Sequence, residues 1–475
     1  MNTSIDTSPR VIPARYMTDD LPGIGGVLKE RPEDFIVEEI PLYEPSGEGE
    51  HIYLFVEKRE MTGLELVGLL ARHFGVKRGA IGYAGMKDKI AVTRQVISIH
   101  TPGKKIEDFP SLEHAKVRVM WADYHANKLR RGHLAGNRFS IRVRGVSGAT
   151  AALTANRVMR VLAREGVPDR FGGQRFGYLC NNHMVGRAMV SGAYADAMKL
   201  LLGPSARSPA YHAEAREHAR AGRWAAARDA FPKGYRTERL VADALAKGAT
   251  AEQAIRSLDT TVLGFYVSAL QSAVFNRVLD ERVTAGTAGE LVVGDIAAGP
   301  GGNGRVPVTD GTLADTELDL AGKLGRFELS PSGPLWGTTM DRAAGAVGEA
   351  EIAALAGVGL TPDDLAGAER LESEMSGGSR RPLRIGLKDI EVEGGMDEHG
   401  SFVRCAFDLP RGAFATTVLG EVMKPERTGV EPGGTRDDAE DDGTANAGEP
   451  NVDGYGHADY EPDTSVLEDD GWVIE

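Results

Sequence analysis

Three segments in the first third of this chain alternate apolar and polar residues, and this alternation limits the possible folds more than any other feature. They are HIYLFVEK at 51–58, HAKVRVMW at 114–121 and RFSIRVRG at 138–145. A period of two places successive side chains on opposite faces of a strand. Each segment therefore predicts a half-buried strand, and the first part of the chain is expected to be rich in β structure.

Helical signals accompany these strands. Residues 62–74 place four apolar side chains on one helical face, with Thr62 and Glu65 at capping-box spacing and Gly75 as a C-terminal cap. Apolar residues recur at helical spacing between positions 262 and 279, and an Ala/Arg/Glu-rich stretch at 206–228 has high helical propensity. The change in composition indicates a middle domain that differs from its flanks.

The segment GYAGMKDKIAVTRQ, residues 82–95, lies where an apolar strand signal ends and another begins. Asp88 stands between Lys87 and Lys89, so the pattern places it in a tight loop between framework segments, where functional groups are often found. A carboxylate between ammonium groups stays ionised at neutral pH. Three interpretations remain open here: a solvated turn, a carboxylate that acts as a nucleophile or a base, or a simple ion-pair partner.

Length and motifs exclude several classes of protein. With 475 residues and 41% hydrophobic residues, the chain can build two or three domains with a large core. Cys180 and Cys405 make neither a disulfide framework nor a four-ligand zinc site, and we expect both to be buried thiols in a reducing cytoplasm. The N-terminus has no apolar signal region, and we expect no segment long enough to span a membrane. The glycine-rich stretches at 23–26 and 299–304 lack the ending of a phosphate loop, and neither a metal-ligand spacing nor a GxSxG motif appears.

The net charge of −14 is unevenly distributed. Residues 425–475 hold 16 acidic residues and 2 arginines, so this segment carries the whole excess and the rest of the chain is neutral. Its Gly, Pro and Asp content predicts a disordered acidic tail. Three stretches of the neutral part are basic: 128–133, 138–145 and 377–384. Such stretches suit a nucleic acid, although each could equally be an ordinary solvated surface.

The loop and several further segments together resemble the TruD family of tRNA pseudouridine synthases. The similarity runs in order over most of residues 22–424. The matching segments are KERPEDFIVEEI, GEGEHIYLFVEK, AGMKDKIAVTRQ, GHLAGNRFSIRVRG, VPDRFGGQRFG, ALQSAVFNRVLDER, PSGPLWG, GSRRPLR and FDLPRGAFATTVLGEVMK.

This resemblance implies a fold and a domain organisation. The fold would be a mixed α/β pseudouridine synthase domain with a mixed sheet, formed by residues 14–166 and closed by residues 385–424. A family-specific domain would be inserted at 167–384, and the acidic tail would follow at 425–475. The implied activity is the isomerisation of a tRNA uridine, with position 13 as the expected target. No cofactor or metal is expected, because the reaction involves no redox change and no external energy. We expect a cytoplasmic monomer that binds tRNA and no membrane.

The resemblance also implies roles for individual residues. Asp88 matches the catalytic aspartate, and Lys29 matches the basic residue that pairs with it. Asn137 would form hydrogen bonds with the uridine, and Phe139 would stack on the base. Phe35 and Phe414 are expected beside the same pocket. The alternation of the sequence gives these three phenylalanines a second interpretation, as core residues. Lys87 and Lys89 could contact phosphate, and Gln174 and Arg175 are expected to order the loop between the domains.

The sequence departs from the family pattern at two places. Asp169 and Arg170 stand where the family usually has Asn-Tyr, and Gly420 stands where it usually has arginine. Both departures affect substrate fit or packing more than the chemistry. Two other functions stay open. One is a non-catalytic RNA-binding protein or RNA chaperone on the same scaffold, and the other is a different enzyme such as a nucleoside hydrolase or phosphotransferase.

Overall fold

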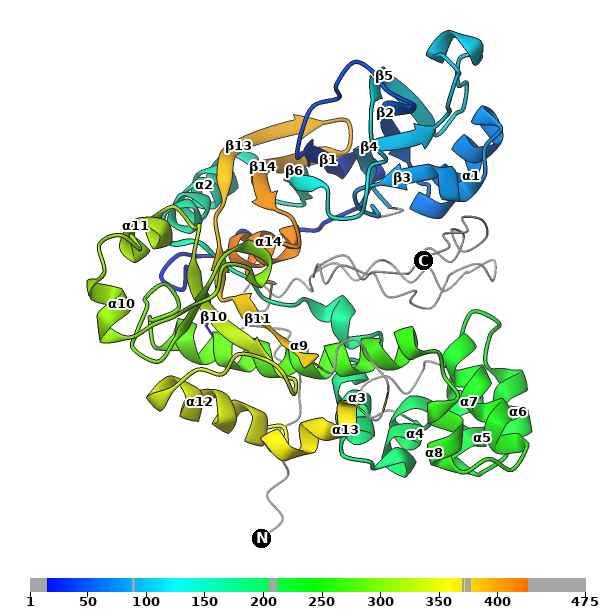
Figure 1. Ribbon diagram of the computed structural model, residues 1–475, viewed down its shortest axis with the longest axis vertical. Coiled ribbons are helices and arrows are strands. Elements are labelled where there is room, and N and C mark those ends of the chain that lie inside the picture. Colours follow the sequence, from blue (N-terminus) through cyan, green and yellow to red (C-terminus); the bar gives the residue numbers. More distant parts are fainter. Residues whose placement is uncertain (1–14, 88–89, 205–211, 370, 372–376, 426–475) are drawn as a thin grey trace, which may run out of the picture.

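The structure is a computed structural model that describes residues 15–87, 90–204, 212–369, 371 and 377–425. The acidic tail from residue 426 onward lies outside the described residues, as do Asp88 and Lys89. A large sheet with three helices forms one part of the molecule, and a mainly helical part lies beside it (Figure 1). The chain leaves the large sheet before the helical part and returns to it afterwards.

The large sheet is mixed, as predicted. Its order is β13-β14-β6-β1-β4-β2-β5, and β3 pairs with β4 outside this path. The β1–β4 pair is parallel, and the other pairs are antiparallel. All three alternating segments form strands of this sheet, which confirms the reading of their period. The strands are β1 (Phe35–Pro41), β2 (His51–Arg59), β3 (Ile81–Tyr83), β4 (Val92–His100), β5 (Val117–His125), β6 (Leu134–Arg144), β13 (Lys388–Asp397) and β14 (Gly400–Pro410).

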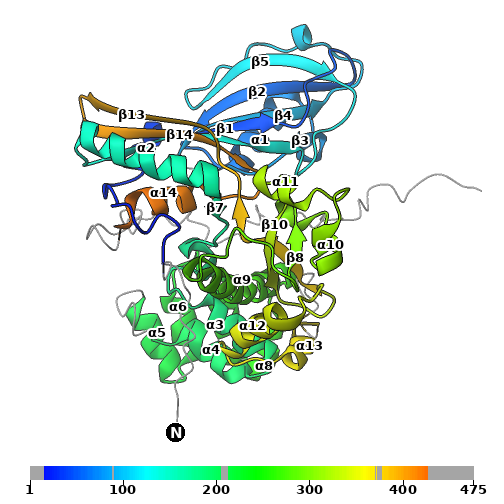
Figure 2. The same ribbon diagram turned by 90° about the vertical axis from the view of Figure 1, so that its left-hand side faces the viewer.

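Three helices accompany the sheet: α1 (Gly63–Phe74), α2 (Gly148–Glu165) and α14 (Ala415–Met423). Helix α1 begins with the predicted capping box between Thr62 and Glu65 and ends at Gly75, whose φ of 65° is left-handed. Helices α2 and α14 pack on the β6–β14 half of the sheet, on the side that faces the helical part (Figure 2). The sheet face that they cover is therefore the inner face of the molecule.

The helical part is built around α9 (Thr260–Thr284). By length and composition this helix could cross a membrane, so the expectation that no segment reaches that length is wrong. Of its most apolar window, 78% is buried inside the protein, as expected of a core helix. The other helices are α3 (Asn182–Val190), α4 (Tyr194–Leu202), α5 (Ala213–Arg220), α6 (Trp224–Ala230), α7 (Arg236–Ala246), α8 (Ala251–Arg256), α10 (Asp310–Ala314), α11 (Leu320–Gly325), α12 (Gly345–Ala356) and α13 (Ala366–Glu369).

Short strands join the helical part to the rest. A four-stranded sheet has the order β11-β10-β8-β9, and β12 pairs with β7 at the junction with α2. Their bounds are β7 (Val167–Pro168), β8 (Ile296–Ala298), β9 (Val306–Pro307), β10 (Ser330–Leu335), β11 (Ser379–Pro382) and β12 (Arg384–Ile385).

The N-terminal segment is fastened to α14. The Glu421 carboxylate accepts hydrogen bonds from the backbone N–H groups of Met17 (2.9 Å) and Thr18 (3.0 Å). The fully buried Lys424 ammonium donates to Thr18 Oγ1 (2.8 Å) and to the Glu421 carbonyl (2.7 Å). The two ends of the described chain therefore meet on one helix.

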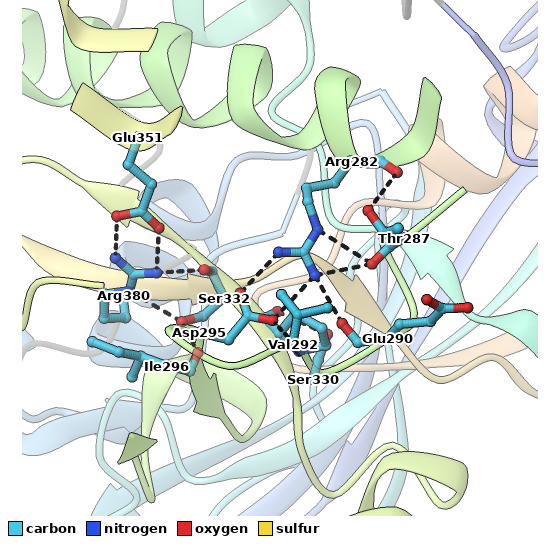
Figure 3. A network of polar contacts seen from close by, with 11 residues as sticks. Arg282, Thr287, Glu290, Val292, Asp295, Ile296, Ser330, Ser332, Glu351 and Arg380 are labelled. Atoms are coloured by element: carbon cyan, nitrogen blue, oxygen red, sulfur yellow. Dashed lines mark hydrogen bonds and ion pairs between the residues drawn. The ribbon is translucent and has the colours of Figure 1, made fainter. Parts of the chain in front are cut away.

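The basic stretch at 377–384 is not the RNA surface that its sequence suggested. Arg380 is fully buried and forms a bidentate ion pair with Glu351, at 2.8 and 2.7 Å (Figure 3). Arg381 pairs with Asp169 at 2.6 Å, and Arg384 donates to the carbonyls of Glu165 and Gly289. Buried charges need such partners, and a sequence window cannot show them.

The arginine face of β6 is also largely neutralised. Its alternation is confirmed, with Phe139, Ile141 and Val143 buried. However, Arg138 pairs with Glu391 and Asp408, and Arg144 pairs with Asp34 and Asp397. The 128–133 stretch differs, because Arg130 and Arg131 are exposed. The exposed Arg411 lies beside them and donates to the Gly132 carbonyl at 2.8 Å, so this is the stretch that presents positive charge to solvent.

Candidate active site

Strands β1 and β6 bring three of the expected site residues, Phe35, Asn137 and Phe139, to one face of the sheet. Their register pairs Val37 with Phe139 and Glu39 with Asn137. Because side chains two residues apart share a face, Phe35 lies on this face as well. The face is the inner one, which α2 and α14 also cover. The β1–β6 pairing therefore gathers residues about 100 positions apart in the sequence into one site.

Lys87 is held on this face by two side chains. Its ammonium donates a hydrogen bond to Asn137 Oδ1 and lies 3.5 Å from Glu39 Oε2. The Lys87 and Glu39 side chains are only 8% and 1% exposed. In such a dry setting a lysine and a glutamate attract each other strongly, so this contact fixes the end of the loop that leads to Asp88. Lys87 is therefore a buried ion-pair partner, and the sequence expectation that it contacts phosphate gains no support from its position.

A second buried lysine, Lys58, contacts the same loop. Lys58 is fully buried at the end of β2. Its ammonium donates to the Met61 carbonyl at 2.7 Å and to the Lys87 carbonyl at 3.3 Å. The backbone at Ala84 is also tied down, because its carbonyl accepts from the Gly132 N–H at 2.8 Å. The described part of the loop is thus anchored at both its ends.

Lys29 and two of the phenylalanines form a second group. The Lys29 ammonium lies 4.4 Å from the centre of the Phe35 ring, which is a cation–π contact. The Phe35 and Phe139 rings meet edge to face at 6.4 Å, and Phe139 also contacts Phe407 at 5.6 Å. Phe35 is 4% exposed and Phe139 is 7% exposed. Both rings belong to the core in this structure, so a stacked base would require them to become accessible.

Phe414 lies in a different cluster. Its ring is 6.4 Å from the ring of Phe171, and the Arg381 guanidinium lies over Phe171 at 4.3 Å and over Phe414 at 5.9 Å. In the described residues, ring contacts connect Phe414 with this cluster and not with Phe35 or Phe139. The expected site residues are therefore distributed over two neighbouring groups, one on the sheet and one at the start of α14.

The family departures have local explanations. Asp169 pairs with Arg381, and Arg170 forms a buried ion pair with Asp280 on α9. Burial raises the pKa of Asp169 to about 6, although the Arg381 guanidinium acts in the opposite direction. A Cβ added at Gly420 would meet no heavy atom within 4 Å, so the position has room for a larger side chain. Both departures are accommodated by the surrounding structure.

The residue expected to carry the chemistry, Asp88, lies outside the described residues, as does Lys89. Sequence reasoning missed two supporting residues, Glu39 and Lys58. A signal for both was present, because each charged residue falls on the apolar face of an otherwise alternating strand. Within the described residues, no group of three or more His, Cys, Asp or Glu side chains is placed to hold a metal ion.

Comparisons with known proteins identify the family of this chain. The family model of tRNA pseudouridine synthase D (TruD) matches residues 12–422. A tRNA pseudouridine synthase D of Geobacter sulfurreducens is 43% identical over 421 residues, which cover 88% of this chain and 98% of the relative. That of Thermus thermophilus is 34% identical, over 87% of this chain and 94% of the relative.

A solved structure shows the same fold. The crystal structure of the putative tRNA pseudouridine synthase D (TruD) from Methanosarcina mazei superposes with a TM-score of 0.75. The two sequences are 28% identical, and the match covers 87% of this chain and 97% of the other.

Proposed function

Because this chain belongs to the TruD family of tRNA pseudouridine synthases, we propose that Asp88 is the carboxylate with which it isomerises the uridine at tRNA position 13. The family and its curated relatives establish the reaction type, an isomerisation of a tRNA uridine. They favour neither a non-catalytic RNA-binding protein nor a different enzyme. The target position and the roles of individual residues are the finer steps that we propose.

The reaction needs a carboxylate close to the ribose. The bond between N1 of uracil and C1′ breaks, the uracil turns, and a bond forms between C5 and C1′, after which C5 loses its proton. In one route, the carboxylate of Asp88 adds to C1′ and is later displaced by C5. In the other, it removes a ribose proton, which is later returned. Atoms and electrons balance in both routes without a cofactor.

The observation that best supports Asp88 is the way its neighbour is held. Lys87 is locked by Asn137 and Glu39, and its carbonyl accepts from Lys58. Such a supporting shell is what positions a reacting group to within a fraction of an ångström. Lys29 stands over Phe35 on the same sheet face and is the proposed charge partner of Asp88.

The remaining residues have proposed roles in holding the nucleotide. The target base must leave its stack before it can react, and an aromatic face compensates for part of that cost. Phe414 is partly exposed and is suited to this contact, whereas Phe35 and Phe139 form the floor beneath the site. Asn137 would exchange its bond with Lys87 for one with the uracil. The exposed arginines 130, 131 and 411 would contact tRNA phosphates. We further propose that the protein works as a monomer in the cytoplasm.

The experiment uses purified full-length protein and tRNA, with pseudouridine located by carbodiimide-dependent reverse-transcription stops. Asp88→Asn should abolish conversion and leave tRNA affinity within about threefold of wild type, because phosphate contacts supply most of the affinity. Asp20→Asn, which changes an exposed carboxylate, is the matched control. Conversion by the Asp88→Asn variant above about a tenth of the wild-type rate would refute the assignment. A stop at another uridine would refute only the position.

A further inference from the structure

Arg175 is half-buried, and its pairing differs from that of the buried Arg144, Arg380 and Arg381. Arg380 has a bidentate carboxylate partner (Figure 3), Arg381 pairs with Asp169, and Arg144 pairs with two aspartates. In the described part of the chain, Arg175 has no carboxylate within ion-pair distance. Within the described residues, the one hydrogen bond of its side chain runs from Nη1 to Ser268 Oγ, at 3.1 Å.

The surroundings of Arg175 hold its guanidinium in place without neutralising it. The residue lies in a short 3-10 turn, Gly173–Phe176, at the entry to the helical part. Its guanidinium carbon is 5.4 Å from the centre of the Phe171 ring and 5.9 Å from that of Phe265, which lies on α9 with Ser268. Two aromatic faces and a hydroxyl therefore orient a planar cation.

The local charge is positive. Two guanidinium groups lie near the Phe171 ring, that of Arg381 at 4.3 Å and that of Arg175 at 5.4 Å. Among the described residues, the one ion pair that either of them forms with an acidic side chain is the pair of Arg381 with Asp169. Burial lowers the pKa of Arg175 to about 10, so the group is still charged at neutral pH. A desolvated charge without a counter-charge is unfavourable, and an anion that binds there would relieve this cost.

We propose that Arg175 binds a phosphodiester group of the tRNA, next to the nucleotide that reacts. A guanidinium offers five N–H donors in a fork that matches two phosphate oxygens, and one of the five is engaged in the described structure. Arg175 is only half-buried, so an external ligand can approach it. The Phe171 ring lies next to both Arg175 and Phe414, and its centre is 6.4 Å from that of the Phe414 ring. A phosphate on Arg175 would therefore lie close to Phe414, the residue proposed to contact the base.

This inference rests on the proposed function, and it competes with a purely structural role. In the structural alternative, Arg175 only connects the turn to α9. This is the role expected from the sequence, where Gln174 and Arg175 order the loop between the domains. The salt dependence of tRNA binding separates the two, because each phosphate contact releases counterions. A structural cation that touches no RNA leaves this dependence unchanged.

The test measures the dissociation constant of full-length protein and tRNA at several salt concentrations. Arg175→Gln should weaken binding about ten- to a hundredfold at low salt, as loss of a charge-assisted hydrogen bond does. It should also reduce the slope of log K against log salt by about one unit or slightly less. Arg175→Lys keeps the charge but not the fork, so it should retain the wild-type slope with intermediate affinity.

Arg326→Gln is the matched control. It removes the same charge from an exposed arginine just after α11 that is already paired with Asp319 and Glu328, and it should leave both the affinity and the slope unchanged. A lower melting temperature of Arg175→Gln with an unchanged slope would overturn the inference in favour of the structural role. Absence of pseudouridine formation by the wild-type protein would instead overturn the proposed function, so the two failures can be told apart.

Discussion

Glu39→Gln should impair both the stability and the activity of this protein, because it removes the charge that faces Lys87 inside the sheet. At the observed separation of 3.5 Å, and with an effective dielectric constant of about 20, the attraction is about 5 kcal/mol. Breaking one side of a buried ion pair costs about 3–5 kcal/mol in practice, because the other charge stays buried. We expect the free energy of unfolding to fall by that amount in urea titrations.

The same substitution should slow catalysis. The Lys87 side chain would settle into a new position, and the start of the loop that carries Asp88 would move with it. A displacement of about 1 Å at a reacting group can cost about a hundredfold in rate. We therefore expect single-turnover pseudouridine formation to slow by about ten- to a hundredfold, with tRNA affinity little changed, because Glu39 is buried and phosphate contacts are made by exposed residues.

Glu38→Gln is a closely matched control for this experiment. Glu38 is the preceding residue of β1, points to the opposite face, and is 39% exposed in its pair with Arg94 at 2.9 Å. An exposed pair of this kind contributes about 1 kcal/mol or less. If Glu39→Gln and Glu38→Gln lose the same small stability and keep the wild-type rate, the ion pair with Lys87 does not organise the loop.

Three further changes test other parts of the structure. Phe139→Ala should lower the free energy of unfolding by about 3–5 kcal/mol, since its ring packs between Phe35 and Phe407; an unchanged urea midpoint would place the ring outside the core. Gly420→Ala should raise the melting temperature, with a gain of about 0.5–1 kcal/mol, because this helical position is open; a lower melting temperature would contradict it. Truncation after Lys424 should tighten binding of non-cognate RNA at low salt, and less so at high salt, if the acidic tail competes with RNA for the protein surface; equal dissociation constants would show that the tail does not affect RNA binding.

The local elements of this fold could be predicted well because their signals are local. The capping box at Thr62 and Glu65 and the left-handed Gly75 are confirmed in α1, and each depends on residues within one helical turn. The alternation of 138–145 correctly predicted a strand with one buried face. The mixed fold class followed from these elements together with the family resemblance.

The sequence could not predict in the same way which charged residues are buried and which are exposed. A window such as GGSRRPLR shows three arginines, but the acid that pairs with Arg380 is Glu351, 29 positions earlier. Charge in a short segment therefore predicted an RNA surface where the structure has buried ion pairs. The opposite error is that Glu39 and Lys58 were not predicted to support the site, although each is a charged residue on the apolar face of its strand. A charged residue on the apolar face of a strand predicts a buried polar site.

The order of strands in the large sheet has a consequence for the synthesis of the protein. Strand β6 lies between β1 and β14, but β14 is made only after the whole helical part. The ribosome must add about 250 residues between them, which takes roughly 10–50 s at usual elongation rates. During that time the nascent chain carries an unpaired β6 edge with its apolar residues, the kind of surface that holdase chaperones bind and that aggregates when left bare. The last turn of α14 then binds Met17 and Thr18, so this N-terminal segment is fastened only after the whole helical part and the last strands of the sheet have been made.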